Sequence, residues 1–160
     1  MIHVNRAALL ASLNAGQAAS ERVIPDLKKL QAALGGGPIV VYEERPTAGL
    51  VRTVELLGGH VVPLLRDPRG EAEVAMATAV LTTPDDVEHV HLVTGAGAIL
   101  PLVRKLREPE FEAWGLTVTL AAPRLGTSVD VLELINNEPR PWIRFLDLTG
   151  LDVTRPAMRG

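Results

Sequence analysis

Short apolar runs of strand length alternate along this chain with stretches whose apolar residues recur at helical spacing. Each of the apolar runs is rich in Val, Ile and Leu and is bounded by Gly, Pro or polar residues. The predicted strands are Ile2–Val4, Pro38–Tyr42, His60–Leu65, His89–Val93 and Leu116–Ala121, with Trp142–Leu148 as a candidate last strand. Continuous apolar runs of this length are typical of a parallel sheet that is covered on both faces.

Helices are predicted between these runs. Their ranges are Arg6–Leu13, Glu21–Leu34, Ala48–Leu57, Glu71–Leu81, Ile99–Arg107 and a last helix that begins near Ser128 and continues through Ile135. In the second of them, apolar residues from Val23 to Leu34 form one stripe, and three glycines follow its end. The alternation predicts an α/β protein: a three-layer sandwich with a mainly parallel central sheet of about five strands.

The domain organisation predicted from the sequence is simple. A length of 160 residues suits one domain with a sizeable core, and the sequence contains no internal repeat or low-complexity linker. We expect a single domain over residues 1–148, followed by a polar, frayed C-terminal tail over residues 149–160.

The composition narrows the possible chemistry. The chain contains no cysteine, which excludes disulfides, thiolate metal sites and cysteine nucleophiles, and suits a reducing compartment. The first residues do not resemble a signal peptide, and no apolar run reaches the roughly 18 residues that a membrane span needs. We therefore expect a cytoplasmic protein that is not inserted in a membrane.

The net charge of −3 argues against a broad basic face for gripping nucleic acid. Local basic patches remain possible, because Arg104, Lys105 and Arg107 fall on one predicted helix, and Arg66 and Arg69 flank a predicted loop. The simplest interpretation of both groups is the solvated face of an amphipathic element.

The most informative segment runs from His91 to Arg107 and reads HLVTGAGAILPLVRKLR. It predicts a buried strand, a tight glycine turn and an amphipathic helix. In an open α/β sheet, ligands bind beyond the carboxyl ends of the strands, which makes Thr94–Ala98 a candidate site together with Asn5, Glu43–Glu44 and the loop from Arg66 to Glu73. The turn at Gly95–Gly97 either presents N–H groups to an anion or is only a tight connection, since the dinucleotide and P-loop fingerprints are absent.

This segment resembles the NYN domains of the PIN-like ribonuclease superfamily, in which a strand leads into Ser-Gly-Asp-Ser-Asp-Phe and then Pro-Leu-Val and a basic helix. The order of further local matches extends the resemblance over Ile2–Leu148. These matches are Val4-Asn5-Arg6-Ala7-Ala8, Val40–Pro46, Leu57–Val62, Arg69–Val74, Val118–Pro123 with Ser128, and Phe145–Leu148.

The resemblance implies metal-assisted phosphodiester hydrolysis, in which a cluster of carboxylates holds Mg²⁺ or Mn²⁺. The four matching positions in this chain are Asn5, Glu73, Ala96 and Ala98. Only one carboxylate and one amide therefore remain from a set of about four. A further carboxylate from Glu43 or Glu44 stays an open alternative. Glu73 also suits the start of a helix, where negative charge is favourable.

We therefore predict a catalytically inactive NYN/PIN-like domain that acts as a binding or regulatory module for RNA, a nucleotide or a protein partner. No catalytic residue and no cofactor is expected, and Asn5, Glu73, Ala96 and Ala98 form a vestigial site. The predicted ligand-binding residues are Asn5, Thr94, Gly95, Gly97, Arg104 and Lys105.

Two alternatives from other classes remain open. One is a ribonuclease with a reduced acidic site, which would use Glu73 as a ligand for Mg²⁺ or Mn²⁺. The other is a structural protein that uses the same scaffold to form a homo-oligomer. If the family match is accidental, a flavodoxin-like or other doubly wound domain is the remaining interpretation.

Other residues that suggest chemistry have simpler interpretations. His89 and His91 share one face of a strand but have no third ligand in view, which favours packing over a metal site. Ser128 and Asp130 suit a helix start better than a catalytic pair. The two tryptophans, at positions 114 and 142, are too isolated in sequence to indicate a platform for stacking bases.

Overall fold

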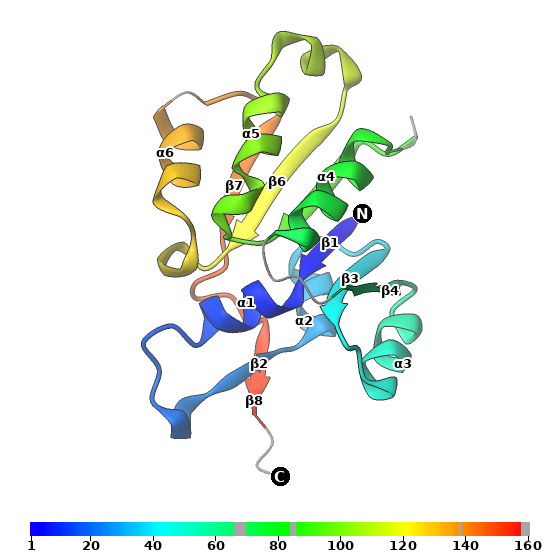
Figure 1. The fold of residues 1–160 in the computed structure, drawn as a ribbon, viewed down its shortest axis with the longest axis vertical. Coiled ribbons are helices and arrows are strands. Elements are labelled where there is room, and N and C mark those ends of the chain that lie inside the picture. Colours follow the sequence, from blue (N-terminus) through cyan, green and yellow to red (C-terminus); the bar gives the residue numbers. More distant parts are fainter. Residues whose placement is uncertain (66–69, 84–85, 138, 158–160) are drawn as a thin grey trace.

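The computed structural model describes the whole chain apart from residues 66–69, 84–85, 138 and 158–160 (Figure 1). Its centre is a six-stranded sheet in the order β4-β3-β1-β5-β6-β7, and all five strand pairings are parallel. The strands are β1 (Ile2–Asn5), β3 (Ile39–Glu44), β4 (His60–Leu64), β5 (His89–Val93), β6 (Thr117–Ala122) and β7 (Ile143–Asp147). The candidate last strand thus joins the sheet as its sixth member.

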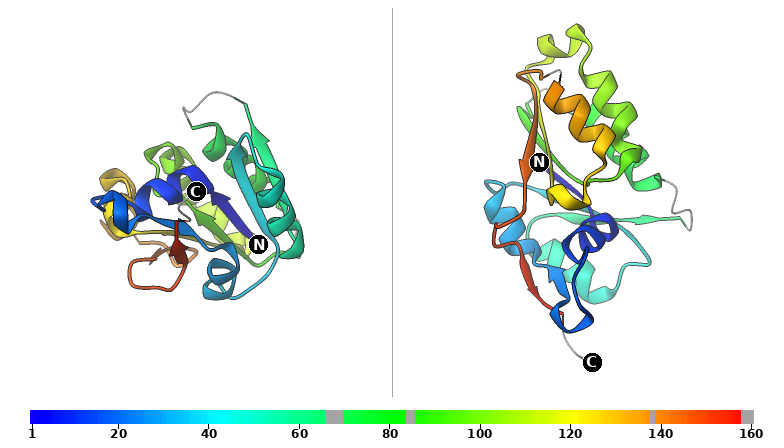
Figure 2. Two further views of the ribbon diagram at one scale, coloured as in Figure 1. Left: turned by 90° about the horizontal axis from the view of Figure 1, so that it is seen from below. Right: turned by 90° about the vertical axis from the view of Figure 1, so that its left-hand side faces the viewer.

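Helices cover both faces of this sheet, which confirms the three-layer α/β sandwich (Figures 1 and 2). One face packs against α4 (Glu71–Leu81), α5 (Leu100–Leu106) and α6 (Val129–Asn137), through buried residues such as Met76, Val103 and Val131. The other face packs against α1 (Arg6–Leu13), α2 (Leu27–Ala33) and α3 (Ala48–Leu56). The core is built from aliphatic side chains, as a chain with 3% aromatic residues requires.

The order of the strands determines where a ligand site is expected. Chain connections lead from β1 to β3 and β4 on one side, and from β5 to β6 and β7 on the other. The order therefore reverses between β1 and β5, as in doubly wound folds. Such a switch point leaves a crevice beyond the carboxyl ends of the two strands.

The predicted helix over Glu21–Leu34 is wrong in its first half. This segment forms a 3₁₀ turn η1 (Ala19–Glu21), a short strand β2 (Val23–Pro25) and then α2. Pro25 has no N–H to donate and disfavours helical geometry in the residue before it, so the apolar stripe does not continue through it. Asp26 instead begins α2, because its Oδ1 accepts a hydrogen bond from the Lys29 amide at 3.1 Å.

The prediction of a frayed tail is also wrong for the residues up to 157. Strand β8 (Thr154–Pro156) pairs antiparallel with β2 to form a second, two-stranded sheet (Figure 1). Val153, just before β8, is 1% exposed and packs in the core beneath α1 and α2. The division into a domain of residues 1–148 and a tail over residues 149–160 stays a prediction.

The remaining differences are small. Residues 108–115, expected as a loose connection, contain the 3₁₀ helix η3 (Pro109–Trp114), and two more 3₁₀ turns are η2 (Gly97–Ile99) and η4 (Arg124–Gly126). The possible basic patch at Arg66 and Arg69 lies outside the described residues. Within the described ranges, no helix has the length and apolar character needed to cross a membrane.

Candidate functional site

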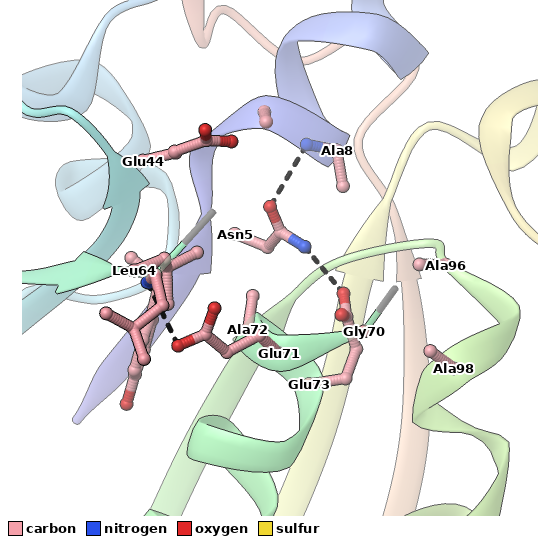
Figure 3. A pocket seen from close by; sticks show the side chains of 13 residues that line it. Asn5, Ala8, Glu44, Leu64, Gly70, Glu71, Ala72, Glu73, Ala96 and Ala98 are labelled. Carbon is pink, nitrogen blue, oxygen red and sulfur yellow. Dashed lines mark hydrogen bonds between the residues drawn. The ribbon is translucent and has the colours of Figure 1, made fainter. Parts of the chain in front are cut away.

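A pocket of about 450 Å³ lies beyond the carboxyl ends of β1, β3, β4 and β5, beside the start of α4 (Figure 3). Its position agrees with the switch point of the sheet. Its lining combines small side chains, which leave the space open, with a few polar ones. The lining residues are Asn5, Ala7, Ala8, Tyr42, Glu44, Leu64, Leu65, Gly70, Glu71, Ala72, Glu73, Ala96 and Ala98.

The centre of the pocket is a hydrogen-bonded group of Asn5, Glu73 and Thr94. Asn5 ends β1, and its Nδ2 donates to Glu73 Oε1 at 2.6 Å (Figure 3). Thr94 follows β5, and its Oγ1 donates to the same Oε1 at 3.0 Å. Glu73 is 3% exposed, and such a buried carboxylate needs donors of this kind. These two neutral donors therefore hold Glu73, the one carboxylate among the four residues that the NYN resemblance pointed to.

Local structure fixes both donors. The Oδ1 of Asn5 caps α1 by accepting a hydrogen bond from the Ala8 amide at 3.1 Å, which turns its Nδ2 towards Glu73. The Oγ1 of Thr94 also accepts a hydrogen bond from the Ala96 amide at 3.2 Å. Each donor is thus oriented by the backbone of the element that follows its strand.

The other two of these four residues, Ala96 and Ala98, present only methyl groups to the pocket. Ala96 lies just before η2 and Ala98 lies within it, and both line the pocket. Ala98 also approaches the chain at Gly70, where an added Cβ would lie 2.9 Å from the Ala98 Cβ. Together the four positions offer an amide, a hydrogen-bonded carboxylate and two methyl groups.

Glu71 is a further carboxylate at this pocket. It falls within the candidate segment from Arg66 to Glu73, but no role was predicted for it. Its Oε1 accepts a hydrogen bond from the Leu65 amide at 3.0 Å, while its Oε2 is buried without a hydrogen-bond partner among the described residues. The available signal was an acidic residue in the first turn of the helix after β4, two places before Glu73. Glu44 also lines the pocket, whereas Glu43 forms an ion pair with Arg6 at 2.9 Å.

The carboxylates at the pocket are not gathered around one point. In the part of the chain that the structure describes, no group of three or more His, Cys, Asp or Glu side chains is arranged to hold a metal ion.

The glycine turn packs closely against the start of α6. A Cβ on Gly95 would lie 2.7 Å from the Gly126 carbonyl oxygen, and the Ser128 amide donates to the Gly95 carbonyl at 2.8 Å. A Cβ on Gly97 would meet the Ser128 Oγ at 3.4 Å. Close packing alone therefore accounts for the glycine at position 95.

The predicted basic residues of α5 lie away from this pocket. Arg104 lines a separate groove between α5 and α6, together with Asp130 and Glu133. Lys105 forms an ion pair with Glu108 at 3.1 Å. Of the predicted ligand-binding residues, the structure brings Asn5 and Thr94 together through Glu73 but does not add Arg104 or Lys105 to the pocket lining.

The histidines and tryptophans make contacts within the fold. The rings of His89 and His91 are 4.4 Å apart, and His89 Nε2 lies 3.1 Å from the hydroxyl of Thr119. Burial, with help from His89 and the amino terminus, lowers the pKa of His91 to about 4. Trp114 stacks on Phe111, with ring centroids 4.6 Å apart.

A third histidine lies below the pocket. His3 is 2% exposed, and its Nδ1 is 2.9 Å from the hydroxyl of Tyr42, a pocket residue. Burial lowers the pKa of His3 to about 4 and raises the pKa of Tyr42 to about 12. Both side chains are therefore neutral at pH 7.

Comparison with known proteins identifies the fold but no family. No family model matches the chain, and no curated protein matches it. The chain is similar to the crystal structure of a protein of unknown function from Vibrio parahaemolyticus, with 17% sequence identity and a TM-score of 0.69. The match covers 96% of this chain and 94% of that one. At this identity it shows a shared parallel α/β fold, which is consistent with a PIN-like or NYN-like arrangement.

Proposed function

We propose that this chain is a PIN/NYN-like domain without nuclease activity that acts as a binding or regulatory module for RNA, a nucleotide or a protein partner. The observation that supports this proposal best is the environment of Glu73. Mg²⁺ and Mn²⁺ sites need several oxygen ligands, of which carboxylates supply most of the affinity. Here Glu73 Oε1 instead accepts hydrogen bonds from Asn5 and Thr94.

The position of the pocket supports the assignment to a PIN/NYN-like domain. The four family positions are spread from residue 5 to residue 98 of the sequence, yet all of them line one pocket. Two of the four are alanines, so the pocket keeps space for a ligand while these two positions offer no oxygen ligand for a cation.

The direct test is cleavage of an RNA that contains single-stranded and structured regions, in Mg²⁺ and in Mn²⁺, by wild type and by Glu73→Gln. We expect no cleavage by either protein beyond that of a blank purification. The amide of glutamine keeps an oxygen that accepts from Asn5 and Thr94, so the variant removes the charge with little change of shape. Cleavage by wild type that is lost in Glu73→Gln would overturn the proposal.

A metal-dependent ribonuclease with a reduced acidic site is the second candidate. The observation in its favour is Glu71 Oε2, a buried carboxylate oxygen at the pocket that has no partner among the described residues. This candidate predicts that Glu71→Gln and Glu73→Gln each abolish cleavage by an active wild type. Cleavage by wild type that both Glu71→Gln and Glu73→Gln abolish would therefore favour this second candidate. No cleavage by wild type would favour the first.

A further inference from the structure

A second cavity, of about 500 Å³, lies on the side of the sheet that α1, α2 and α3 cover. Its walls come from the starts of α1, α2 and α3 and from β8, which Figure 1 draws in the lower part of the molecule. We call it the basic groove, because three of its lining residues are Arg6, Lys28 and Arg155. These residues come from distant parts of the sequence and meet only in the fold.

The charges of the basic groove differ from those of the molecule as a whole. The chain has a net charge of −3, but the groove has three cationic side chains, of which Arg6 is paired with Glu43 at 2.9 Å, and one acidic lining residue, Asp26. The Oδ1 of Asp26 already accepts the Lys29 amide as the cap of α2. Among the described residues, neither Lys28 nor Arg155 forms an ion pair, so both charges are available to a ligand.

The remaining lining suits an anion as well. Thr47 begins the nine-residue helix α3 and lines the groove together with Gly49 and Thr53. A Cβ on Gly49 would meet nothing closer than 4.0 Å, so the first turn of α3 is open. The positive end of a helix dipole adds to the attraction of Lys28 and Arg155 for an anion.

We propose that the basic groove binds phosphate groups, supplied either by the backbone of a single-stranded RNA or by a free nucleotide. Arginine and lysine side chains with open space between them are the usual protein ligands of phosphate. The groove adjoins the pocket at the end of β1, because Asn5 lines the pocket and the next residue, Arg6, lines the groove. The inference does not depend on whether the pocket cleaves RNA.

The test is fluorescence anisotropy of a labelled single-stranded RNA of about 12 nucleotides, a length that spans a typical binding site. EDTA in the buffer prevents metal-dependent cleavage, so failure of the proposed function cannot imitate failure of this inference. The groove variant is Lys28→Gln with Arg155→Gln. The matched control is Arg52→Gln with Arg144→Gln, which removes the same charge from exposed residues outside the groove lining.

We expect the groove variant to weaken RNA binding at least about tenfold and to reduce the slope of log Kd against log salt by about 1.4, as the loss of two phosphate contacts requires. The control should remain within about twofold of wild type. Displacement of the RNA by millimolar ATP or inorganic phosphate would identify a free phosphate group as sufficient, and its absence would identify the RNA backbone. No binding of RNA, ATP or phosphate by wild type, or equal weakening in both variants, would overturn the inference.

Discussion

Asn5 illustrates how one side chain serves two neighbouring parts of the structure at once. Its carbonyl oxygen caps α1 while its amide nitrogen donates to Glu73, 2.6 Å away. An aspartate would cap the helix equally well but would place two carboxylates in contact in a buried position. Like charges at that distance are strongly unfavourable unless a cation separates them. The amide thus supplies a donor that the buried Glu73 carboxylate needs.

Asn5→Asp should therefore destabilise the protein by about 2 kcal/mol in EDTA, because it replaces a donor with a like charge. Urea unfolding at pH 7.5 measures the change. Asn136→Asp, at an exposed position of α6, is the control and should remain within about 0.5 kcal/mol of wild type. Equal stability of Asn5→Asp and wild type would contradict this account of the site.

Gly95 and Gly97 flank Ala96 in one turn but differ in the space around them. Gly95→Ala should cost about 1–3 kcal/mol, since the new methyl group would lie 2.7 Å from a carbonyl oxygen. Gly97→Ala should cost less, because its methyl group would meet only the Ser128 hydroxyl at 3.4 Å. Thermal unfolding of both variants checks the order, and a more severe effect at Gly97 would show that the turn packs differently.

His3 makes stability depend on pH. Burial lowers its pKa to about 4 from the ordinary histidine value of 6.5, with smaller contributions from the amino terminus and His60. Between these pH values the unfolded chain binds a proton that the folded chain does not bind, so stability is lost as the pH falls from 6.5 to 4. The loss due to His3 can reach about 3 kcal/mol. His3→Gln should flatten the pH profile of urea unfolding in this window, and parallel profiles would contradict the assignment.

At the scale of elements, the parallel strands and most helices were predictable because their signals are local. Asn5, Asp26 and Thr47 each accept a hydrogen bond from an amide in the first turn of a helix, and apolar runs identify the buried strands. The pairing of β2 with β8 was not predictable, because residues 23–25 and 154–156 are remote in sequence and each strand is only three residues long.

The contrast between local signals and contacts of remote segments also holds for the residues of the candidate sites. The family resemblance drew attention to Asn5 and Glu73, and the structure links them directly. Glu71 lay within a candidate segment but had no predicted role, since an acidic residue in a first helical turn is common for electrostatic reasons alone. The sequence also could not indicate the basic groove, whose Lys28 and Arg155 meet only through the β2–β8 pairing.

The β2–β8 sheet should contribute to stability, because Val153 beside it is 1% exposed in the core. Val153→Ala should destabilise the protein by about 2 kcal/mol through the loss of buried methyl groups. Leu151→Ala removes a side chain that is 41% exposed and should cost clearly less. Chemical denaturation compares the two variants, and an unaffected Val153→Ala protein would mean that the segment after residue 148 is frayed in solution.

At the scale of the whole molecule, the doubly wound sheet brings two different surfaces to the carboxyl end of β1. The pocket contains three glutamates and small side chains, and the basic groove contains Lys28, Arg155 and an Arg6 that is paired with Glu43. The proposed binding of phosphate in the groove therefore rests on a local charge that differs from the net charge of −3.

The central claim is that the pocket has lost the metal site of a nuclease, and Mn²⁺ binding tests this most directly. Isothermal titration calorimetry of wild type and Glu73→Gln with Mn²⁺ at pH 7.5 reports any site that uses this carboxylate. The account predicts the same weak, nonspecific heats from both proteins and no site tighter than about 1 mM. A one-site isotherm in wild type that disappears in Glu73→Gln would contradict it and would restore the ribonuclease interpretation.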